Sequence, residues 1–359
     1  MASPLDYLTQ GSRIFFHGWK ARFTKKRYSG NADEICRQIV KECWNGTYFQ
    51  TSTGNFPQFW TRDFGWCTSS LLKLGYTEEV YKTLRYALNN FQKKRKVTTT
   101  LTKRGTPFDF PTMAVDSLPW LIHSIKISKF SYHTYRQFLN QQIHLFFDTF
   151  IDVKTGLVKM KHFSSIKDFA IRKSSCYDNC VVAMLAKDLT KMKLDNPFAK
   201  YNYPALLKKR FWNGSYFYDD LQKKEYVAGD ANIFPFVLGI IGEKAMMESA
   251  VEEIEDAGLA DPFPLKYTSS RQGVKFIHQE IFLRNYESHA IWMHMGPLYM
   301  KLLKHVDKEL YEKHKKTYTE LIETHGNFLE VFTAKGKPFS TPFYYCDAGM
   351  LWAANYLVL

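Results

Sequence analysis

The chain has 359 residues, of which 45% are hydrophobic and 23% charged, as is ordinary for a folded globular protein. Its formal net charge is +14, and basic residues gather near 13–27, 93–96, 103–104 and 208–210 without a nucleic-acid-binding motif. No stretch approaches the ~20 apolar residues of a membrane span, and the N-terminus lacks the apolar core of a signal peptide. These features exclude nucleic acid and membrane as expected partners and predict a cytoplasmic protein, whereas the oligomeric state stays open.

Apolar residues recur at three- and four-residue spacing along most of the chain, which predicts about twelve helices. Loops rich in Gly, Pro, Asn or Asp separate them. The sequence pattern for strands is weak, and it predicts only one small β-hairpin, at 216–229. The expected helices are 32–44, 63–74, 78–93, 113–127, 133–149, 178–190, 231–241, 243–256, 287–303, 308–325 and 346–357, with a short one near 204–210.

The sequence W-N-G-[ST]-Y-F occurs twice, at 44–49 and 212–217, and each copy precedes a loop and then an aspartate that starts an apolar helix. Helical hairpins of this kind cannot bury their apolar faces alone, and neighbours complete the core. We therefore predict an all-α (α/α)6 barrel of six helical hairpins with small β-hairpin insertions. It should form a single catalytic domain over 31–359, after a basic leader at 1–30.

The segment SSCYDNC at 174–180 places two cysteines four residues apart, but no other Cys or His lies at metal-ligand spacing. The six cysteines are too sparse for a disulfide framework and are expected to be buried thiols. The sequence also lacks a Gly-rich phosphate loop, an H-E-x-x-H motif, a C-x-x-C pair and a G-x-S-x-G elbow. We expect neither a metal nor a cofactor.

Acidic residues stand at helix starts beside aromatic residues. Any one of them could simply cap its helix, as aspartate often does. Six hairpins would nevertheless bring the set to one pocket, and a ring of carboxylates and aromatic faces suits a sugar. The set comprises Asp63, Asp116, Asp178, Asp230, Glu287 and Asp347.

Five segments in unchanged order across 56–357 resemble the amylo-α-1,6-glucosidases, members of the six-hairpin glycosidase superfamily. FPQFWTRDFGWCTSSLLKLG at 56–75 is similar to their W-x-R-D segment, and MAVDSLPWLIHSI at 113–125 to V-D-A-x-L-W-F. ESHAIWMHMGPLYMKLL at 287–303 resembles G-T-V-W-P-W-x-x-G-P, although Met293 and His294 replace the P-W pair. The segments 216–241 and 327–357 resemble the R-P-N-Q region and the closing glutamate region.

The resemblance implies an inverting glycoside hydrolase, exo-acting on an α-glucoside or related short saccharide, with Asp178 as general acid and Glu330 as general base. Apolar neighbours of Asp178 predict a raised pKa, which a proton donor needs. The two carboxyls should lie about 6.5–9.5 Å apart. Because the net charge is positive, an anionic glycoside remains an open possibility for the substrate. The candidate substrate-binding residues are Trp60, Arg62, Asp63, Asp116, Tyr177, Asp230, Glu287 and Trp292.

Two other functions remain open from the residues alone. A sugar epimerase or isomerase on the same barrel would use histidines as acid and base, and His289 and His294 are the candidates. A non-catalytic carbohydrate-binding relative is the second alternative. A structure in which Asp178 and Glu330 do not face one cavity would favour it.

Overall fold

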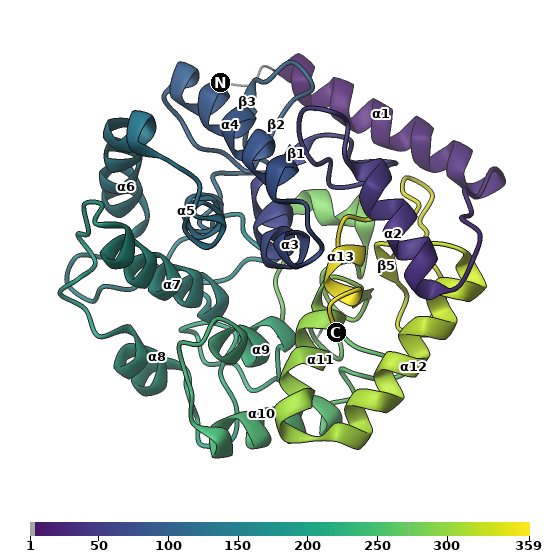
Figure 1. Ribbon diagram of the computed structural model, residues 1–359. Helices are drawn as coiled ribbons and strands as arrows, with labels where there is room; N and C mark the ends of the chain where they lie inside the picture. Colours follow the sequence, from purple (N-terminus) through teal and green to yellow (C-terminus); the bar gives the residue numbers. More distant parts are fainter. Residues whose placement is uncertain (1–3, 272) are drawn as a thin grey trace.

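Two concentric rings of helices form the protein (Figure 1), in a computed structural model that describes residues 4–271 and 273–359. Each inner helix of the described chain packs against its two neighbours, and α13 packs back on α3, so the ring closes. This is the predicted (α/α)6 barrel. The inner helices are α3 (Thr61–Lys73), α5 (Ser117–Ser128), α7 (Cys176–Met192), α9 (Gly229–Val237), α11 (Met295–Val306) and α13 (Ala353–Tyr356). The outer helices are α2 (Ala32–Cys43), α4 (Thr77–Lys94), α6 (Arg136–Phe150), α8 (Tyr203–Phe211), α10 (Lys244–Asp256) and α12 (Lys308–His325).

The two rings differ in their apolar patterns. The outer helix α2 buries one stripe, including Ile35, Ile39 and Val40, and begins with a capping box between Asn31 and Glu34. The inner helix α7 is buried on nearly every side, because it lies between the outer ring and its inner neighbours. A helix that is apolar all round gives a weaker periodic signal than an amphipathic one.

Close packing of the inner ring requires a small residue in α3. A Cβ atom added at Gly65 would lie 2.6 Å from the Cβ atom of Trp120 on α5, closer than real contacts allow. Glycine at this position therefore lets α3 and α5 approach each other.

Short strands join loops at the end of the barrel where the inner helices begin. β1 (Phe59–Trp60), β2 (Thr100–Leu101) and β3 (Pro107–Phe108) form an antiparallel sheet, with Phe59 opposite Leu101 and Thr100 opposite Phe108. β4 (Ile291–Trp292) pairs with β5 (Val331–Phe332), so Trp292 lies opposite Val331. The two sheets place Trp60 and Trp292 at the same end of the barrel.

The β-hairpin predicted at 216–229 is wrong, because this segment contains only isolated bridges, such as Trp212 to Phe217 and Ser175 to Asp220. The repeated W-N-G motif instead makes a turn after an outer helix, α2 in one copy and α8 in the other. In both copies the asparagine side chain accepts hydrogen bonds from the backbone two and three residues later. The motif is thus a local turn that the hairpins reuse.

Some predicted helix bounds were also wrong. The segment 287–303 is helical only from Met295, and 346–357 only over Ala353–Tyr356. The preceding residues are loop and strand that fold over the barrel end. They carry apolar residues because they are buried there, not because they are helical.

The basic leader contains a helix, α1 (Pro4–Phe23), which lies at the rim of the barrel (Figure 1). Arg13 donates a hydrogen bond to the backbone oxygen of Asn55 at 2.6 Å, and Arg22 donates one to that of Tyr344 at 3.2 Å. These contacts tie α1 to two loops at the barrel end. The structure also has the short 3-10 helices η1 (His133–Tyr135) and η2 (His278–Leu283).

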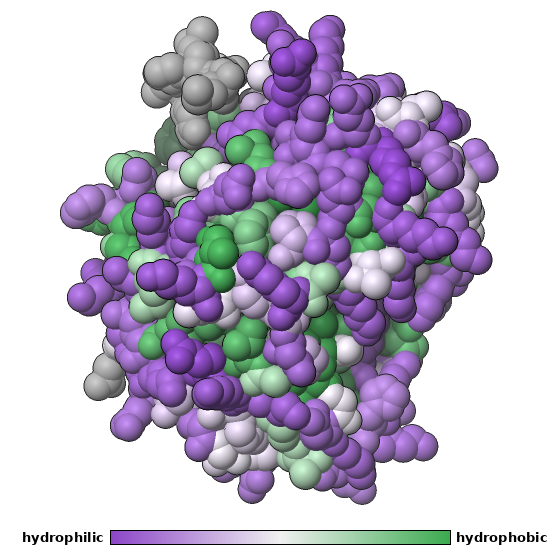
Figure 2. Space-filling model, turned by 90° about the vertical axis from the view of Figure 1, so that its left-hand side faces the viewer, coloured by the Kyte–Doolittle hydropathy of each residue, from purple (hydrophilic) through white to green (hydrophobic). Residues whose placement is uncertain are grey.

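The side of the molecule that carries α6 and α8 is covered mostly by hydrophilic side chains, with hydrophobic ones in small patches between them (Figure 2). Among the described helices, none combines the length and the apolar character needed to cross a bilayer. All six cysteines are buried and unpaired, as the sequence predicted.

Candidate active site

Loops that precede the inner helices surround a cavity of about 810 Å³, counting space that is open to solvent. The cavity combines aromatic walls with a small number of charged groups, as ligand sites commonly do. Its polar and aromatic lining residues include Trp60, Arg62, Asp63, Trp66, Asp168, Tyr267, Tyr286, Glu287, Trp292, His294, Glu330, Tyr344 and Trp352. α1 also contributes one side chain, Ile14.

Glu330 lies directly before β5 and is held by three donors. The hydroxyl of Tyr286 donates to Oε1 at 2.5 Å, the hydroxyl of Tyr344 donates to Oε2, and the backbone N–H of Asp347 donates to Oε2 at 2.9 Å. Burial, with the charge of Asp347, raises the pKa of Glu330 to about 7 despite these donors. Glu330 is therefore a fixed carboxyl that ionises close to neutrality.

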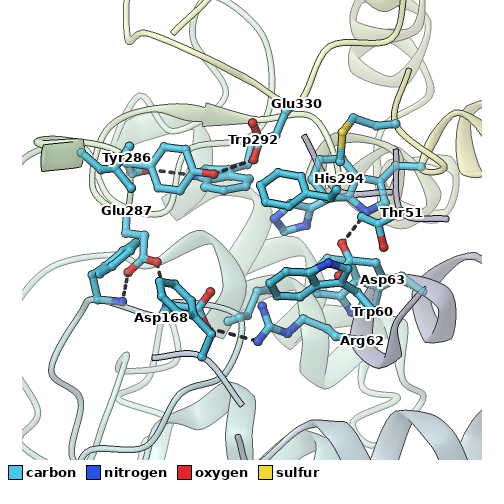
Figure 3. A pocket seen from close by; sticks show the side chains of 18 of the residues that line it. Thr51, Trp60, Arg62, Asp63, Asp168, Tyr286, Glu287, Trp292, His294 and Glu330 are labelled. Atoms are coloured by element: carbon cyan, nitrogen blue, oxygen red, sulfur yellow. Dashed lines mark hydrogen bonds and ion pairs between the residues drawn. The ribbon is translucent and has the colours of Figure 1, made fainter. Parts of the chain in front are cut away.

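Asp168 supplies a second carboxyl, on the opposite side of the cavity from Glu330 (Figure 3). It comes from the loop between α6 and α7, which spans 151–175. Its Oδ1 accepts a hydrogen bond from Arg62 at 3.3 Å and another from the hydroxyl of Ser164, and its side chain is 19% exposed. Asp168 was not among the predicted site residues, because it stands in a loop rather than at a helix start.

Glu287 fixes the backbone on which Asp168 stands. Its carboxylate accepts three backbone N–H hydrogen bonds, from Asp168 at 2.6 Å, Phe169 at 2.7 Å and Ala170 at 2.9 Å. Burial and the charge of Asp168 raise the pKa of Glu287 to about 8, although these three donors lower it. At Glu287 the effect of burial therefore outweighs that of the three donors.

Arg62 and Asp63 come from the first turn of α3. Arg62 pairs with Asp116 at 2.6 Å and with Asp168 at 3.3 Å. Asp63 Oδ1 accepts a hydrogen bond from the indole of Trp352 at 2.9 Å, and burial raises the pKa of Asp63 to about 6. A cation and a carboxylate side by side can bind several sugar hydroxyls.

Asp116 and Tyr177 form a layer behind Arg62 and are not among the residues that line the cavity. The hydroxyl of Tyr177 donates to Asp116 at 3.1 Å and itself accepts a hydrogen bond from the indole of Trp120 at 3.0 Å. Burial raises the pKa of Asp116 to about 6, although the adjacent Arg62 lowers it. These two candidate binding residues therefore orient the guanidinium of Arg62.

A buried ionic network anchors both ends of the segment 167–172, which carries Asp168. Lys167 lies 2.8 Å from Asp230 and 3.2 Å from Asp219. Arg172 lies 2.9 Å from Asp230. Asp230, a candidate binding residue, thus supports the loop from below and is not among the residues that line the cavity.

Asp178 lies in the first turn of α7, whose N-terminus is capped by Ser175. It is buried and is not among the residues that line the cavity. Burial raises its pKa, in the direction the sequence predicted, although Arg172 lowers it. Asp178 and Glu330 therefore do not both face this cavity, whereas Asp168 and Glu330 do.

His294 lies in the aromatic wall, with its ring stacked on Trp66 at a centroid distance of 4.4 Å. The Tyr267 hydroxyl donates its only proton to the backbone oxygen of Ile166. It therefore acts as the acceptor of a hydrogen bond from Nε2 of His294, at 3.0 Å. Burial, with the charge of Arg62, holds the pKa of His294 well below its usual value, so the ring is neutral. The other histidine candidate, His289, is not a lining residue.

No protein-family model and no curated protein matches the sequence. Solved structures do match it. A bacterial glucoamylase complexed with acarbose has a TM-score of 0.63 at 11% identity, over 98% of this chain and 57% of that one. A mannosylglycerate hydrolase from Thermus thermophilus has a TM-score of 0.62 at 10% identity, over 91% and 99% of the chains. A rhamnosidase from Klebsiella oxytoca with rhamnose bound has a TM-score of 0.61 at 10% identity, over 93% and 65%.

The chain has the six-hairpin glycosidase fold. This agrees with the fold that the resemblance of the sequence segments implied. At 10–11% identity the match establishes the fold, and the activity has to be argued from the cavity.

Within this six-hairpin fold, the candidate residues divide into two groups. Those that line the cavity are Trp60, Arg62, Asp63, Glu287, Trp292 and Glu330. Those outside its lining are Asp116, Tyr177, Asp178 and Asp230. The cavity residues outside the predicted set include Trp66, Asp168, Tyr286, Tyr344 and Trp352. Tyr286 and Tyr344 lie in loops without a periodic signal, whereas Trp66 lies within α3, where an aromatic residue looks like any other core residue.

Proposed function

We propose that this protein is a glycoside hydrolase that removes a terminal sugar with inversion at the anomeric carbon. The observation that supports this most is the pair of carboxyls, Asp168 and Glu330, on opposite sides of one aromatic-walled cavity (Figure 3). Inverting hydrolysis needs a proton donor for the leaving oxygen and a carboxylate that activates water on the other face of the sugar. Among the solved neighbours are enzymes named as a rhamnosidase and a glucoamylase, which supports a glycoside as substrate.

Glu330 suits the role of general base. Its two oxygens are fixed by Tyr286, Tyr344 and the backbone of Asp347, and its pKa of about 7 allows it to accept a proton from water near neutrality. Both tyrosines line the cavity, so the base and its supports form one wall.

Asp168 suits the role of general acid better than Asp178 does. Asp168 lines the cavity on the side opposite Glu330 (Figure 3), whereas Asp178 is not a lining residue. Both oxygens of Glu287 already accept backbone N–H groups, so Asp168 is the carboxyl of this wall that can contact the leaving oxygen. We assign Asp178 a positioning role next to Arg172, which anchors the same loop.

The substrate is proposed to be a short saccharide or glycoside whose terminal sugar contacts Arg62 and Asp63. Both side chains come from the start of an inner helix, and Trp352, which directly precedes the neighbouring inner helix α13, fixes Asp63. An α-glucoside is proposed from the resemblance to the amylo-α-1,6-glucosidases. Nearly all charged groups of this cavity are acidic, which favours a neutral sugar over an anionic one.

The two alternative functions fit the cavity less well. Epimerisation by paired histidines is not favoured, because His294 is neutral and buried and His289 is outside the cavity lining. We expected a non-catalytic relative if Asp178 and Glu330 did not face one cavity, and in the structure only Glu330 lines it. However, Asp168 supplies a carboxyl at the cavity, so both groups required for hydrolysis are present.

The test is a panel of unactivated glycosides, with the anomer of the first product followed by NMR. Asp168→Asn should lower kcat by about 10²–10⁴-fold, and Glu330→Gln by at least as much, while both proteins stay folded. A glycosyl fluoride, whose leaving group needs no proton, should restore turnover in Asp168→Asn but not in Glu330→Gln. If Asp178→Asn, rather than Asp168→Asn, shows this rescue, Asp178 is the acid. No hydrolysis of any glycoside by the wild-type protein would refute the proposed function.

A further inference from the structure

A second cavity adjoins the proposed active site, beneath α1. It encloses about 660 Å³, counting space that is open to solvent. Four side chains line both cavities, namely Ile14, Phe56, Trp60 and Phe110. The two cavities therefore meet at a shared apolar boundary.

The second cavity differs in chemistry from the first. Its walls are formed mainly by the four shared side chains and Phe108. The wall also contains Arg13, Gln58, Thr100 and Thr102. Arg13 donates to the backbone oxygen of Asn55, the hydroxyl of Thr100 donates to that of Phe59 at 2.6 Å, and the hydroxyl of Thr102 accepts the backbone N–H of Thr106 at 3.1 Å. The wall thus offers little to the many hydroxyls of a second sugar, whereas an apolar group could displace water from it.

The second cavity lies on the side of the proposed proton donor. Phe110, at the shared boundary, makes an edge contact with Phe169 at a centroid distance of 6.1 Å. Phe169 follows Asp168 in the sequence, and its backbone N–H also donates to Glu287, at 2.7 Å. In glycoside hydrolysis the leaving group departs on the side of the acid, so a leaving group beside Asp168 faces this boundary.

α1 is needed to complete the second cavity. Ile14 and Gly11 belong to this helix, and Arg13 fixes it to the loop of Asn55, which also carries Phe56. Phe56 in turn makes an edge contact with Trp60 at 5.6 Å. The N-terminal helix, which the barrel itself does not require, thereby contributes to the substrate side of the molecule.

We propose that the second cavity binds an apolar aglycone, so that the substrate class is an alkyl or aryl glycoside rather than an oligosaccharide. This inference rests on the proposed hydrolase function and specifies its leaving group. The sugar ring would lie among Arg62, Asp63, Asp168 and Glu330, and the apolar group would lie among Ile14, Phe56 and Phe110.

The test compares octyl with methyl glycosides of glucose, mannose and rhamnose, all below the concentration at which micelles form. For the sugar that is hydrolysed, kcat/KM should be about tenfold or more higher for the octyl compound, because its chain is buried. Ile14→Asp should reduce this octyl-to-methyl ratio about fivefold or more, and the matched variant Ile14→Leu should preserve it. A ratio near one, or a high ratio that Ile14→Asp leaves unchanged, would overturn the inference while leaving the hydrolase proposal intact.

Binding separates this inference from the hydrolase proposal. The 1-thio analogues of the same octyl and methyl glycosides resist hydrolysis, and their affinity can be measured by isothermal titration calorimetry. Tighter binding of an octyl thioglycoside that depends on Ile14 would support the apolar site even if no glycoside were cleaved. Equal binding of octyl and methyl compounds, or binding of neither, would overturn it.

Discussion

Glu287 holds Asp168 by its backbone: Oε1 of Glu287 accepts the N–H of Asp168 at 2.6 Å, across 119 positions of sequence. Oε2 accepts the next two N–H groups of the same loop. Glu287 belongs to the segment that leads into β4, whereas Asp168 belongs to the loop before α7. This one side chain therefore joins two walls of the cavity and sets where the proposed acid stands.

Replacing Glu287 by glutamine should test that role. One amide oxygen remains, but the amide N–H₂ would face backbone N–H donors, so the loop of Asp168 should shift. We expect kcat to fall about tenfold to hundredfold, with KM much less affected, because a small misplacement of a catalytic group is costly. Glu248→Gln, an exposed change on α10, is the matched control and should leave kcat unaltered. Unchanged kcat in Glu287→Gln would show that the loop does not depend on this contact.

The pH dependence of kcat/KM should be a narrow bell. Glu330 must be ionised to act as base, and its pKa of about 7 places the acidic limb there. Above the pKa of about 8 of Glu287, this side chain gains a negative charge beneath the loop of Asp168, and we place the alkaline limb there. Activity should thus fall below pH 7 and above pH 8, as measured by initial rates on an unactivated glycoside.

Asp347→Asn separates the two limbs. The charge of Asp347 helps to raise the pKa of Glu330, so its removal should move the acidic limb to lower pH and leave the alkaline limb in place. Glu287→Gln should instead move the alkaline limb. A profile that is flat from pH 5 to pH 9 would contradict both assignments.

The helical order of the barrel could be read from the sequence, because outer helices such as α2, α4 and α12 bury a single stripe and give a clear 3.6-residue period. The bounds of α11 and α13 could not be. The loops before them are buried over the barrel end and carry the same density of apolar residues as a helix. The helix α1 was not expected, since a basic leader without a periodic pattern gives no helical signal.

The cavity lining was predictable where a lining residue coincides with a helix start, as for Arg62 and Asp63, or with a segment that resembles the family, as for Glu330. Asp168 met neither condition. One usable signal was present: its loop runs over 25 positions, 151–175, which is long for a structureless connection, and such loops are usually functional. The charges of Lys167, Asp168 and Arg172 in an otherwise apolar stretch point to the same place.

Glu330 should also limit the stability of the protein. Its pKa is raised from 4.5 to about 7 in the folded state, so folding favours the protonated form. Its contribution to stability is complete below pH 4.5 and is lost as the pH rises through 7. Glu330→Gln, which resembles the protonated form, should raise the free energy of unfolding at pH 8 by at most ~3 kcal/mol and have little effect near pH 4.5. Urea unfolding at both pH values measures this, and equal effects at both would contradict the assigned pKa.

Removal of Lys167 should lower the free energy of unfolding more than removal of any other ionic residue. Its side chain is 1% exposed and pairs with Asp219 and Asp230, both of which are also buried. In Lys167→Met the two aspartates would keep only Arg172 as a buried cation, and breaking a buried pair costs about 3–5 kcal/mol. Lys244→Met is the matched control, because Lys244 is 71% exposed and its pair with Glu248 should contribute about 0.5 kcal/mol or less.

The same variant separates folding from catalysis. Lys167 stands next to Asp168, so Lys167→Met should lower kcat even at a temperature at which the variant is fully folded. Urea unfolding of both lysine variants, with kcat measured well below the midpoint, distinguishes the two effects. If Lys167→Met cost no more stability than Lys244→Met, the network beneath Asp168 would not hold the loop, and the placement of the proposed acid would have to come from Glu287, Arg62 and Ser164.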